Sequence, residues 1–333
     1  MKKIKIAQIG TSGESHGRMI FDSIKKQSDI FDIVGYALPE NEEEKFPEAV
    51  KNFDGYKRMS VSEILSNPEI EAVAIETEEI YLTKYAILAA KAKKHIHMEK
   101  PGGLEPEQFE QLINIVRDNK LVFHIGYMYR YNPYIKKLFE RVKKGELGKI
   151  LGIEAQMDCI HSNTTRKWLE TFGDGGMMFF LGCHLIDIVL QLQGMPEKIT
   201  PFNKSSGIDG INSKDFCMAI LEYPAGVSFV KTVDTELGGY ARRQIVVHGT
   251  KKTVELKPLE MTEGDDLLYT GKTEYTSTNW SDRGIYTKSP LFDRYDDMMS
   301  SFASMVRCEI KNPWSYDYEL SLYKTVLKAC NMY

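Results

Sequence analysis

The segment "HIHMEKPGG", residues 95–103, ends an alternating apolar run on a lysine. The alternation predicts a buried strand, and Pro101 with the two glycines after it predicts the end of that strand. At the carboxyl end of a parallel strand, the ammonium group of Lys100 can donate a hydrogen bond to a substrate hydroxyl or carbonyl oxygen. Partial burial would lower the pKa of that ammonium group toward the range useful for acid–base catalysis. Taken alone, the tripeptide also fits a solvent-exposed Lys100 paired with Glu99.

A glycine-rich turn provides a second set of candidate residues. The stretch "GTSGESHG", residues 10–17, lies between a predicted strand at 4–9 and an apolar-periodic segment at 19–24. Such a turn offers backbone N–H groups and the positive end of a helix to a pyrophosphate, although any strand-to-helix turn favours glycine and serine. The spacing departs from Gly-x-Gly-x-x-Gly, because serines stand at the second and third glycine positions unless Gly13 takes the second role. The candidate cofactor-binding residues here are Gly10, Thr11, Ser12, Gly13 and Ser15.

The end of the second predicted strand bears on which dinucleotide would bind. In dinucleotide-binding folds an acidic residue there hydrogen-bonds the ribose, and a nearby arginine accommodates a 2′-phosphate. This position is Leu38, with Glu40 two residues later and no arginine beside it. We therefore expect NAD as the cofactor, with NADP left open, and count Leu38 and Glu40 as candidate cofactor-binding residues. A solvated acidic loop is the other interpretation of this segment.

Composition and charge exclude several classes of partner. Lysine and arginine number 43 against 47 aspartate and glutamate, a net charge of −4 without the basic footprint that nucleic acid or an anionic membrane requires. No stretch approaches the roughly 18 apolar residues of a spanning helix, and we expect no signal peptide. The five cysteines show no Cys-x-x-Cys spacing, so we expect neither a disulfide framework nor a metal site. These features predict a cytoplasmic protein that acts on small molecules.

The order of the predicted elements indicates two domains, as does the length of 333 residues at roughly 150 per domain. Residues 1–123 alternate strands and helices, which predicts an α/β domain with a doubly wound parallel sheet. In residues 124–333 turns rather than helices join most strands, which predicts an α+β domain with a mostly antiparallel sheet. The polar segment 257–290 stays unassigned. Predicted strands are 4–9, 31–37, 72–75, 96–99, 121–127, 150–161, 216–222, 226–232, 244–248 and 252–256; predicted helices are 19–24, 82–92, 106–119, 132–148, 176–193 and 294–309, with a closing segment at 317–331.

Several segments together resemble the Gfo/Idh/MocA family of NAD(P)-dependent oxidoreductases. Besides the N-terminal turn they are "AAKAKKHIHMEKPGGLEPEQFEQL", "IGYMYRYNP", "GELGKI" and "GGMMFFLGCHLIDIVL", in the family's order and approximate spacing. The resemblance implies a Rossmann domain followed by a domain with a large open sheet. Because that sheet typically packs against another subunit's, it also implies a homodimer or homotetramer.

The same resemblance assigns roles to individual residues. Lys100 and His184 are the predicted catalytic residues, both of them transferring protons near the substrate. Thr77, Glu99 and Trp168 are implied neighbours of the cofactor. A histidine in an apolar helix is otherwise a core residue, and Trp168 also fits the packing of a domain seam.

One departure from the family pattern affects the substrate site. Phe180 stands where the family has an aspartate that normally helps to bind the reacting hydroxyl. Asp174, Asp158 or His161 could supply the missing contact, Lys100 and His184 could act alone, or the site could be degenerate. The predicted substrate-binding residues are Tyr129, Asp158, His161, Arg166, Phe180 and His184.

Three functions fit these observations. The first is the oxidation of a secondary hydroxyl of a sugar, cyclitol or glycoside to a ketone with NAD(P). The second is glycoside cleavage, in which bound NAD transiently oxidises a ring carbon and permits elimination. The third is a non-catalytic dinucleotide-binding sensor or regulator, which Phe180 and the altered turn favour.

Overall fold

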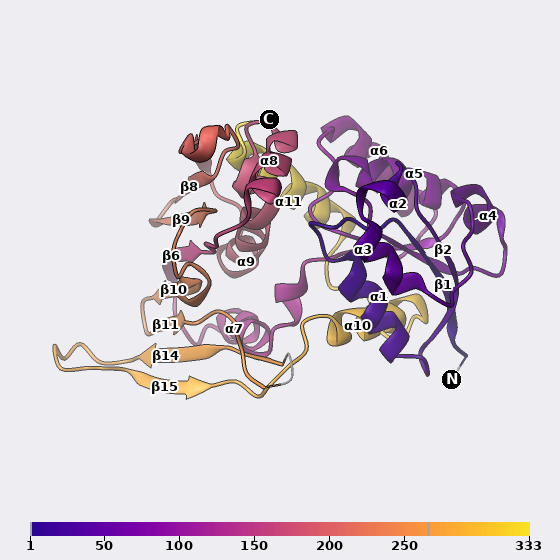
Figure 1. Ribbon diagram of the computed structural model, residues 1–333. Coiled ribbons are helices and arrows are strands. Elements are labelled where there is room, and N and C mark those ends of the chain that lie inside the picture. The colour runs from indigo at the N-terminus through magenta and orange to yellow at the C-terminus, as the bar shows by residue number, and fades with distance from the viewer. Residues whose placement is uncertain (1, 265–266) are drawn as a thin grey trace. The chain divides into compact units, whose positions relative to one another are not determined.

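The computed structural model describes residues 2–264 and 267–333, which form two compact units (Figure 1). The first unit comprises Met1–Tyr127 and Tyr295–Tyr323, and the second comprises Met128–Arg294 and Lys324–Tyr333. The sequence analysis divided the chain at residue 123 and assigned everything after it to the second domain. The structure differs because helix α10 (Asp296–Val306) packs on helix α1 (Gly17–Lys26), where Ser23 Oγ donates to Asp296 Oδ1 at 2.8 Å.

The first unit contains a five-stranded parallel sheet in the order β2-β1-β3-β4-β5. Its strands are short runs of mostly buried residues, as expected when helices cover both faces of a parallel sheet. The doubly wound fold predicted from the sequence is confirmed. Ligands of such sheets bind beyond the carboxyl ends of the strands, where the strand order reverses. The strands are β1 (Ile4–Ile9), β2 (Phe31–Ala37), β3 (Ala72–Ile75), β4 (His95–Met98) and β5 (Phe123–Ile125).

Helix ends in this unit follow from local sequence. Helix α1 begins at the last glycine of the glycine-rich turn. Ser60 caps α4 (Val61–Ser66) in a capping box, because its side chain accepts from the N–H of Glu63 and the Glu63 carboxylate accepts from the N–H of Ser60. The other helical segments are α2 (Glu42–Lys45), α3 (Pro47–Val50), η1 (Lys51–Phe53), η2 (Glu79–Tyr81), α5 (Leu82–Lys91), α6 (Pro106–Asp118) and the first part of α11 (Tyr316–Ala329).

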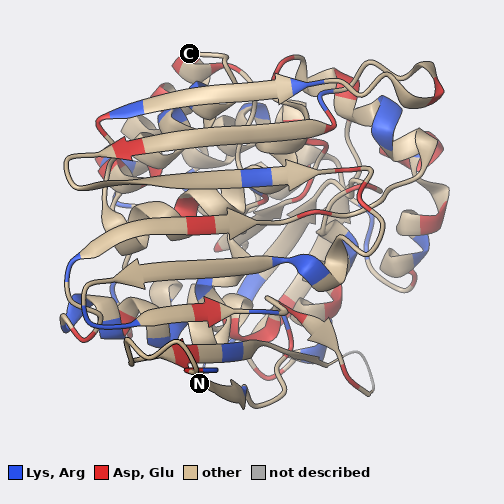
Figure 2. Ribbon diagram, turned by 90° about the vertical axis from the view of Figure 1, so that its left-hand side faces the viewer, with Lys and Arg blue, Asp and Glu red and all other residues tan. Residues whose placement is uncertain are grey.

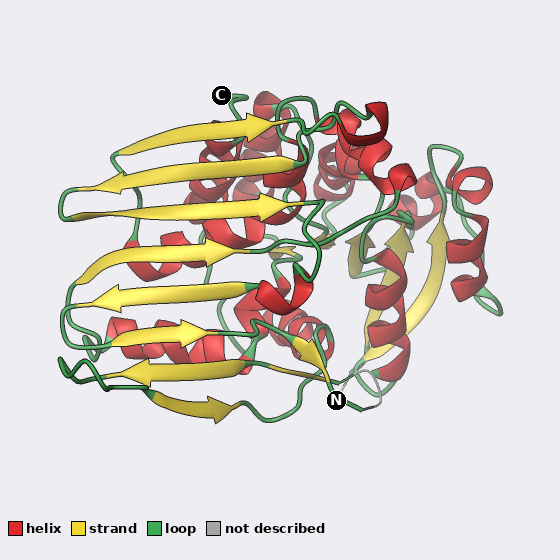
Figure 3. Ribbon diagram, turned by 60° about the vertical axis from the view of Figure 1, so that its left-hand side comes forward, coloured by secondary structure: helices red, strands yellow, loops and turns green. Residues whose placement is uncertain are grey.

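The second unit contains an eight-stranded sheet in the order β15-β14-β11-β10-β6-β9-β8-β7. Neighbouring strands are antiparallel except β6 and β9, which are parallel. Helices lie over one face (Figure 3), and Figure 2 shows that most residues along the strands are uncharged. The strands are β6 (Ile150–Gln156), β7 (Lys198–Lys204), β8 (Phe216–Tyr223), β9 (Gly226–Val233), β10 (Gln244–Gly249), β11 (Thr253–Leu256), β14 (Gly271–Tyr275) and β15 (Ile285–Lys288).

The segment 257–290, which the sequence analysis left unassigned, contributes strands to this unit. Strands β14 and β15 pair at one edge of the large sheet, and β12 (Met261–Thr262) and β13 (Leu268–Tyr269) form a separate pair. Residues 265 and 266 lie outside the described residues. Strand β7, at the other edge, was also not predicted.

The helix predicted at 176–193 is not a single α-helix. A π-helical turn, Met178–Gly182, comes directly before α9 (Cys183–Gln193), and such turns are frequent at functional sites. None of the helices within residues 2–264 and 267–333 combines the length and the apolar character needed to cross a membrane. The remaining helical segments are η3 (Met128–Tyr131), α7 (Pro133–Lys143), α8 (Asn163–Trp168), η4 (Leu169–Phe172), η6 (Ile208–Gly210) and η7 (Tyr240–Arg242).

Candidate functional site

Lys100 lies two residues beyond the end of β4 and is completely buried, with 0% of its surface exposed. Its Nζ is 3.6 Å from Glu99 Oε1. The solvent-exposed lysine that the tripeptide alone allowed is therefore wrong, whereas the pairing with Glu99 is present. A buried ammonium group is stable only with compensating charge and hydrogen bonds, so its surroundings decide what Lys100 can do.

Three buried carboxyl groups surround this lysine: Glu76, Glu79 and Glu99. Burial, and then the charges of Glu99 and Glu79, raise the pKa of Glu76 well above its usual value. Burial also raises the pKa of Glu79 to about 7. Burial alone would raise the pKa of Glu99 as well, but the charges of His16 and Lys100 outweigh it and lower that pKa. The lowered pKa of Glu99 keeps this carboxylate ionised next to Lys100 at neutral pH, whereas Glu79 is only partly ionised there.

Histidines extend this cluster. The Nδ1 atom of His16 is 3.2 Å from Glu99 Oε1, and the Nε2 atom of His97 is 3.4 Å from Glu76 Oε1. On its other side, His97 Nδ1 lies 2.8 Å from His124 Nδ1. Burial lowers the pKa of His97 to about 4, so its ring is neutral. A set of groups that can carry protons therefore adjoins Lys100, and the sequence analysis did not identify His16, His97 or Glu76 as part of it.

The glycine-rich turn has the geometry of an anion site. Gly10 has φ +93°, and a Cβ there would lie 2.5 Å from the backbone nitrogen of Thr77, so no other residue fits. The N–H of Thr11 donates to Glu42 Oε2 at 3.1 Å. Glu42 is fully buried, and burial raises its pKa to about 8. A carboxyl group of the chain itself thus occupies a backbone donor where the resemblance placed a pyrophosphate oxygen.

Two further polar groups of the turn also form hydrogen bonds within the first unit. Ser12 N–H donates to the carbonyl of Glu76 at 2.9 Å, and Ser15 Oγ donates to Glu79 Oε1 at 3.1 Å. The ring of Phe46 packs on Gly13, where a Cβ would meet it at 2.7 Å. The turn, its glycines and the sheet edge fit a dinucleotide, and the Thr11 donor becomes accessible once the Glu42 carboxyl moves away.

The carboxyl end of β2 lines an open cavity of about 510 Å³. Leu38 lies in its wall, and so does Arg58, which the bridge between Tyr36 and Arg58 brings to the end of this strand. Glu40 accepts a hydrogen bond from Tyr85 Oη at 2.6 Å and pairs with Lys84. The absence of a neighbouring arginine in the sequence was the reason to prefer NAD, and Arg58 removes that reason. The sequence analysis missed Arg58 as a neighbour of this strand end because it lies 20 positions after Leu38.

In the second unit, His184 lies in the first turn of α9 and is 1% exposed. The ring of Tyr129 meets its ring edge-on, with centroids 5.2 Å apart. Asp187, three residues further along α9, forms a bidentate ion pair with Arg130, both contacts being 2.9 Å. The buried charge of Arg130 is therefore balanced by Asp187.

Phe180 lies within the π-helical turn and belongs to an aromatic cluster. Its ring meets Trp168 at 5.2 Å and His161 at 6.1 Å, centroid to centroid. Trp168 also contacts Phe172 at 4.8 Å. The aspartate-to-phenylalanine change thus replaces a polar position by an apolar one that neighbouring aromatic rings support.

The other predicted substrate residues have partners within the second unit. Tyr129 Oη donates to the buried Glu260 at 2.6 Å. Lys231 Nζ donates to Asp158 at 3.2 Å, and burial raises the pKa of Asp158 to about 6. Arg166 is buried, and its nearest charged partners are Asp215 at 3.2 Å and Asp209 at 3.3 Å.

Two family models match the chain in succession. Residues 4–127 match the oxidoreductase family with an NAD-binding Rossmann fold. Residues 135–255 match the GFO/IDH/MocA C-terminal domain. Together the two matches cover more than half of the chain.

Curated relatives are similar over part of their length. An uncharacterized oxidoreductase of Rhizobium meliloti is 28% identical over 208 residues, which is 62% of this chain and 61% of the relative. The scyllo-inositol 2-dehydrogenase (NADP(+)) of Bacillus subtilis is 24% identical over 164 residues, 49% of this chain and 46% of the relative. The chain thus spans about half to three-fifths of the length of these relatives.

A solved structure of a levoglucosan dehydrogenase in complex with NADH and levoglucosan has a TM-score of 0.77 and 16% identity. The likeness covers 99% of this chain and 98% of that chain, and it shows a shared fold.

Proposed function

Because the chain belongs to the Gfo/Idh/MocA family of oxidoreductases, we propose that it is an NAD(P)-dependent dehydrogenase acting on a secondary hydroxyl of a sugar, cyclitol or glycoside. The observation that carries this proposal is the complete burial of Lys100 beside Glu99 at the end of a parallel strand. A structural lysine at such a position would reach water with its ammonium group, since burial of an unneeded charge is costly. Buried and held next to a carboxylate, the group suits proton exchange instead.

Lys100 has the role of transferring the hydroxyl proton as the alcohol becomes a ketone. The ammonium group must first pass a proton on before its amine can accept the one from the hydroxyl, and the Glu99 carboxylate, 3.6 Å from Nζ, with His16 3.2 Å beyond it, offers a route for that proton. When bound, the dinucleotide supplies the hydride acceptor. His184 is the second proposed proton-handling residue, and Phe180 favours a substrate that presents an apolar ring face.

The test is absorbance of reduced nicotinamide during incubation with NAD or NADP and a panel of sugars, inositols and glycosides. Lys100→Ala should lower the rate at least about a hundredfold, as expected for the loss of a general acid–base group. Lys94→Ala is the matched control. Lys94 is buried before the start of the same strand, and its Nζ donates to the carbonyls of Asn67 and Ile70. Equal losses in the two variants, or undiminished turnover by Lys100→Ala, would contradict the proposal.

A non-catalytic dinucleotide sensor is the second candidate, and two observations favour it. The Glu42 carboxyl occupies the Thr11 donor, and Phe180 removes a polar group from the substrate site. This candidate predicts saturable binding of NAD(P)H, followed by the quenching of tryptophan fluorescence, with no turnover on any member of the panel. Turnover that depends on Lys100 eliminates it.

A further inference from the structure

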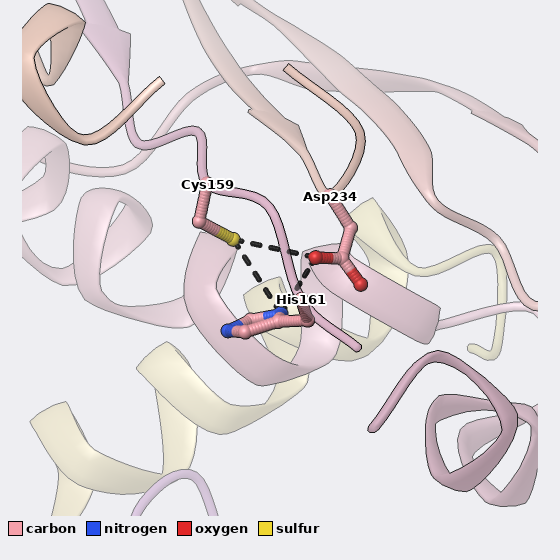
Figure 4. A group of neighbouring side chains, drawn as sticks. All are labelled: Cys159, His161 and Asp234. Atoms are coloured by element: carbon pink, nitrogen blue, oxygen red, sulfur yellow. Dashed lines mark hydrogen bonds and ion pairs between the residues drawn. The ribbon is translucent and has the colours of Figure 1, made fainter. Parts of the chain in front are cut away.

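Cys159, His161 and Asp234 come together at one end of the second unit's sheet (Figure 4). The first two follow β6, and Asp234 follows its parallel neighbour β9. Backbone pairing continues beyond both strands, because Cys159 N–H donates to the carbonyl of Val233 at 2.8 Å and Ile160 bridges to Thr235. The three residues lie just beyond the strand ends, and these backbone contacts tie their two segments together.

Three different ligand atoms point toward one another in this cluster. Cys159 Sγ lies 3.5 Å from His161 Nδ1 and 3.5 Å from Asp234 Oδ1. His161 Nδ1 lies 2.6 Å from the same carboxylate oxygen. In a nucleophilic triad the two ring nitrogens of the histidine face the nucleophile and the carboxylate separately. Here Nδ1 faces both, and Figure 4 shows the other nitrogen directed away. The three atoms therefore surround one point, as metal ligands do, and do not form the chain of hydrogen bonds found in a catalytic triad.

The distances suit a cation at the point of convergence. Around tetrahedral zinc, bonds of about 2.3 Å to sulfur and about 2.0 Å to nitrogen or oxygen place a sulfur about 3.5 Å from each other ligand. Both sulfur distances in the cluster have this value. The contact between His161 and Asp234 is shorter because it is an ion pair, and it would open by about 0.7 Å on metal binding.

Burial separates the ligands from bulk water on all sides but one. Cys159 is 5% exposed and Asp234 is 0% exposed, and the second carboxylate oxygen of Asp234 has no hydrogen-bond partner among the described residues. The side chain of His161 is 28% exposed, so the open side of the cluster lies next to this ring. Burial and the charge of Asp234 raise the pKa of the Cys159 thiol, whereas a bound cation would favour the thiolate.

We propose that Cys159, His161 and Asp234 form a site for one Zn²⁺ ion, with three protein ligands and a fourth position open to an oxygen ligand. A thiolate, an imidazole and a carboxylate form a donor set of the kind that zinc binds, and three protein ligands with one open position are typical of catalytic rather than structural zinc sites. The metal site itself does not depend on the proposed dehydrogenase function. If that function holds, the open position next to Phe180 would bind a substrate oxygen, which the phenylalanine cannot do.

Cobalt binding tests the site without reference to activity. The purified chain, stripped with a chelator, should bind about one Co²⁺ ion per chain and develop the near-ultraviolet thiolate-to-cobalt charge-transfer band of a sulfur-ligated site. Cys159→Ser should abolish the band. His161→Ala changes a partly exposed side chain and should weaken binding at least about tenfold, as should Asp234→Asn.

Cys308→Ser is the matched control, because Cys308 is an exposed thiol in the first unit. It should leave both the band and the affinity for Co²⁺ unchanged. Circular dichroism checks that each variant is folded. If Cys159→Ser does not fold, the cobalt affinity of His161→Ala tests the site instead. Absence of the band in the folded wild-type chain, or full-strength binding by folded His161→Ala, would overturn the proposal. If the chain binds cobalt but oxidises no substrate, the metal site is supported and the proposed dehydrogenase function is contradicted.

Discussion

Glu42 competes with a ligand of the glycine-rich turn for one backbone N–H group. Its carboxyl group accepts the Thr11 N–H at 3.1 Å, and a dinucleotide must displace it to use that donor. Glu42→Ala removes the competitor and should tighten NAD(P)H binding about fivefold, which corresponds to roughly 1 kcal/mol for one hydrogen bond. Glu42→Gln keeps an oxygen acceptor in place and should bind like the wild type. Fluorescence titration of the three proteins measures this order, and weaker binding by Glu42→Ala would contradict it.

The same residue makes the stability of the first unit depend on pH. Folding raises the pKa of Glu42 from the ordinary 4.5 to about 8, so between these values the folded state holds a proton that the unfolded state has lost. Raising the pH through this window therefore favours unfolding, by at most about 1.4 kcal/mol per pH unit. Glu79, with a pKa of about 7, acts in the same direction, whereas the lowered pKa of Glu99 matters only in acid.

Urea unfolding at pH 5.5 and pH 8 should show the wild type to be more stable at the lower pH. In Glu42→Gln this difference should shrink, because an amide does not titrate. If the difference in stability between the two pH values were as large in Glu42→Gln as in the wild type, other groups would cause the pH dependence.

Lys100 and His184 could be picked out from the sequence as candidates, because the roles proposed for them rest on short continuous motifs. Glu42, Arg58 and Asp234 could not. Arg58 comes 20 positions after Leu38 and lines the same cavity because it bridges to Tyr36, and 73 positions separate Asp234 from His161. Spacing along the chain carries no signal for such contacts. The expectation of no metal site, which relied on the absence of Cys-x-x-Cys spacing, stays a prediction that the cobalt experiment tests against the proposed site.

At the scale of elements, the buried strands and most of the helices followed from apolar periodicity. Strands β7, β14 and β15 did not: β7 and β15 are the edge strands of the large sheet, β14 lies next to β15, and the residues of all three are largely half-exposed or exposed. Without a fully buried face, a strand lacks the alternation that predicts it. The π-helical turn before α9 was missed because all five of its residues are buried, so the segment has no alternation of apolar and polar residues in which a shift of phase could be seen.

The parallel pair β6 and β9 carries the proposed metal ligands, and one glycine sets how closely the two strands approach. A Cβ on Gly226 would lie 1.7 Å from the carbonyl oxygen of Leu151. Gly226→Ala should therefore force the strands apart and destabilise the second unit by about 3 kcal/mol or more. Differential scanning calorimetry measures the loss. Gly238→Asn, at a left-handed position with nothing within 4 Å, is the control and should melt close to the wild type. An unaltered melting curve for Gly226→Ala would refute this account of the pairing.

At the scale of the whole molecule, the open face of the large sheet is the surface through which we expect copies of the chain to associate. Helices cover its other face (Figure 3), and Figure 2 shows that most residues along the strands of this sheet are uncharged. Phe229 of β9 pairs with Ile220 of β8. The next residue along β9, Val230, is buried on the helix-covered side, so Phe229 points to the open face. Val227, on the same side of β9, is 56% exposed. Apolar residues grouped on one sheet face are typical of an isologous interface.

Light scattering coupled to gel filtration should accordingly give a dimer or tetramer for the wild type. Phe229→Lys should shift the population toward monomer, because it places a charge in an interface that buries about 800 Å² per partner. Ile310→Lys makes the same change at an exposed residue of the first unit and should leave the mass unaltered. A monomeric wild type, or an oligomer that resists Phe229→Lys while Ile310→Lys dissociates it, would remove the sheet face as the interface. Loss of the oligomer without loss of cobalt binding would further show that the proposed metal site is complete within one chain.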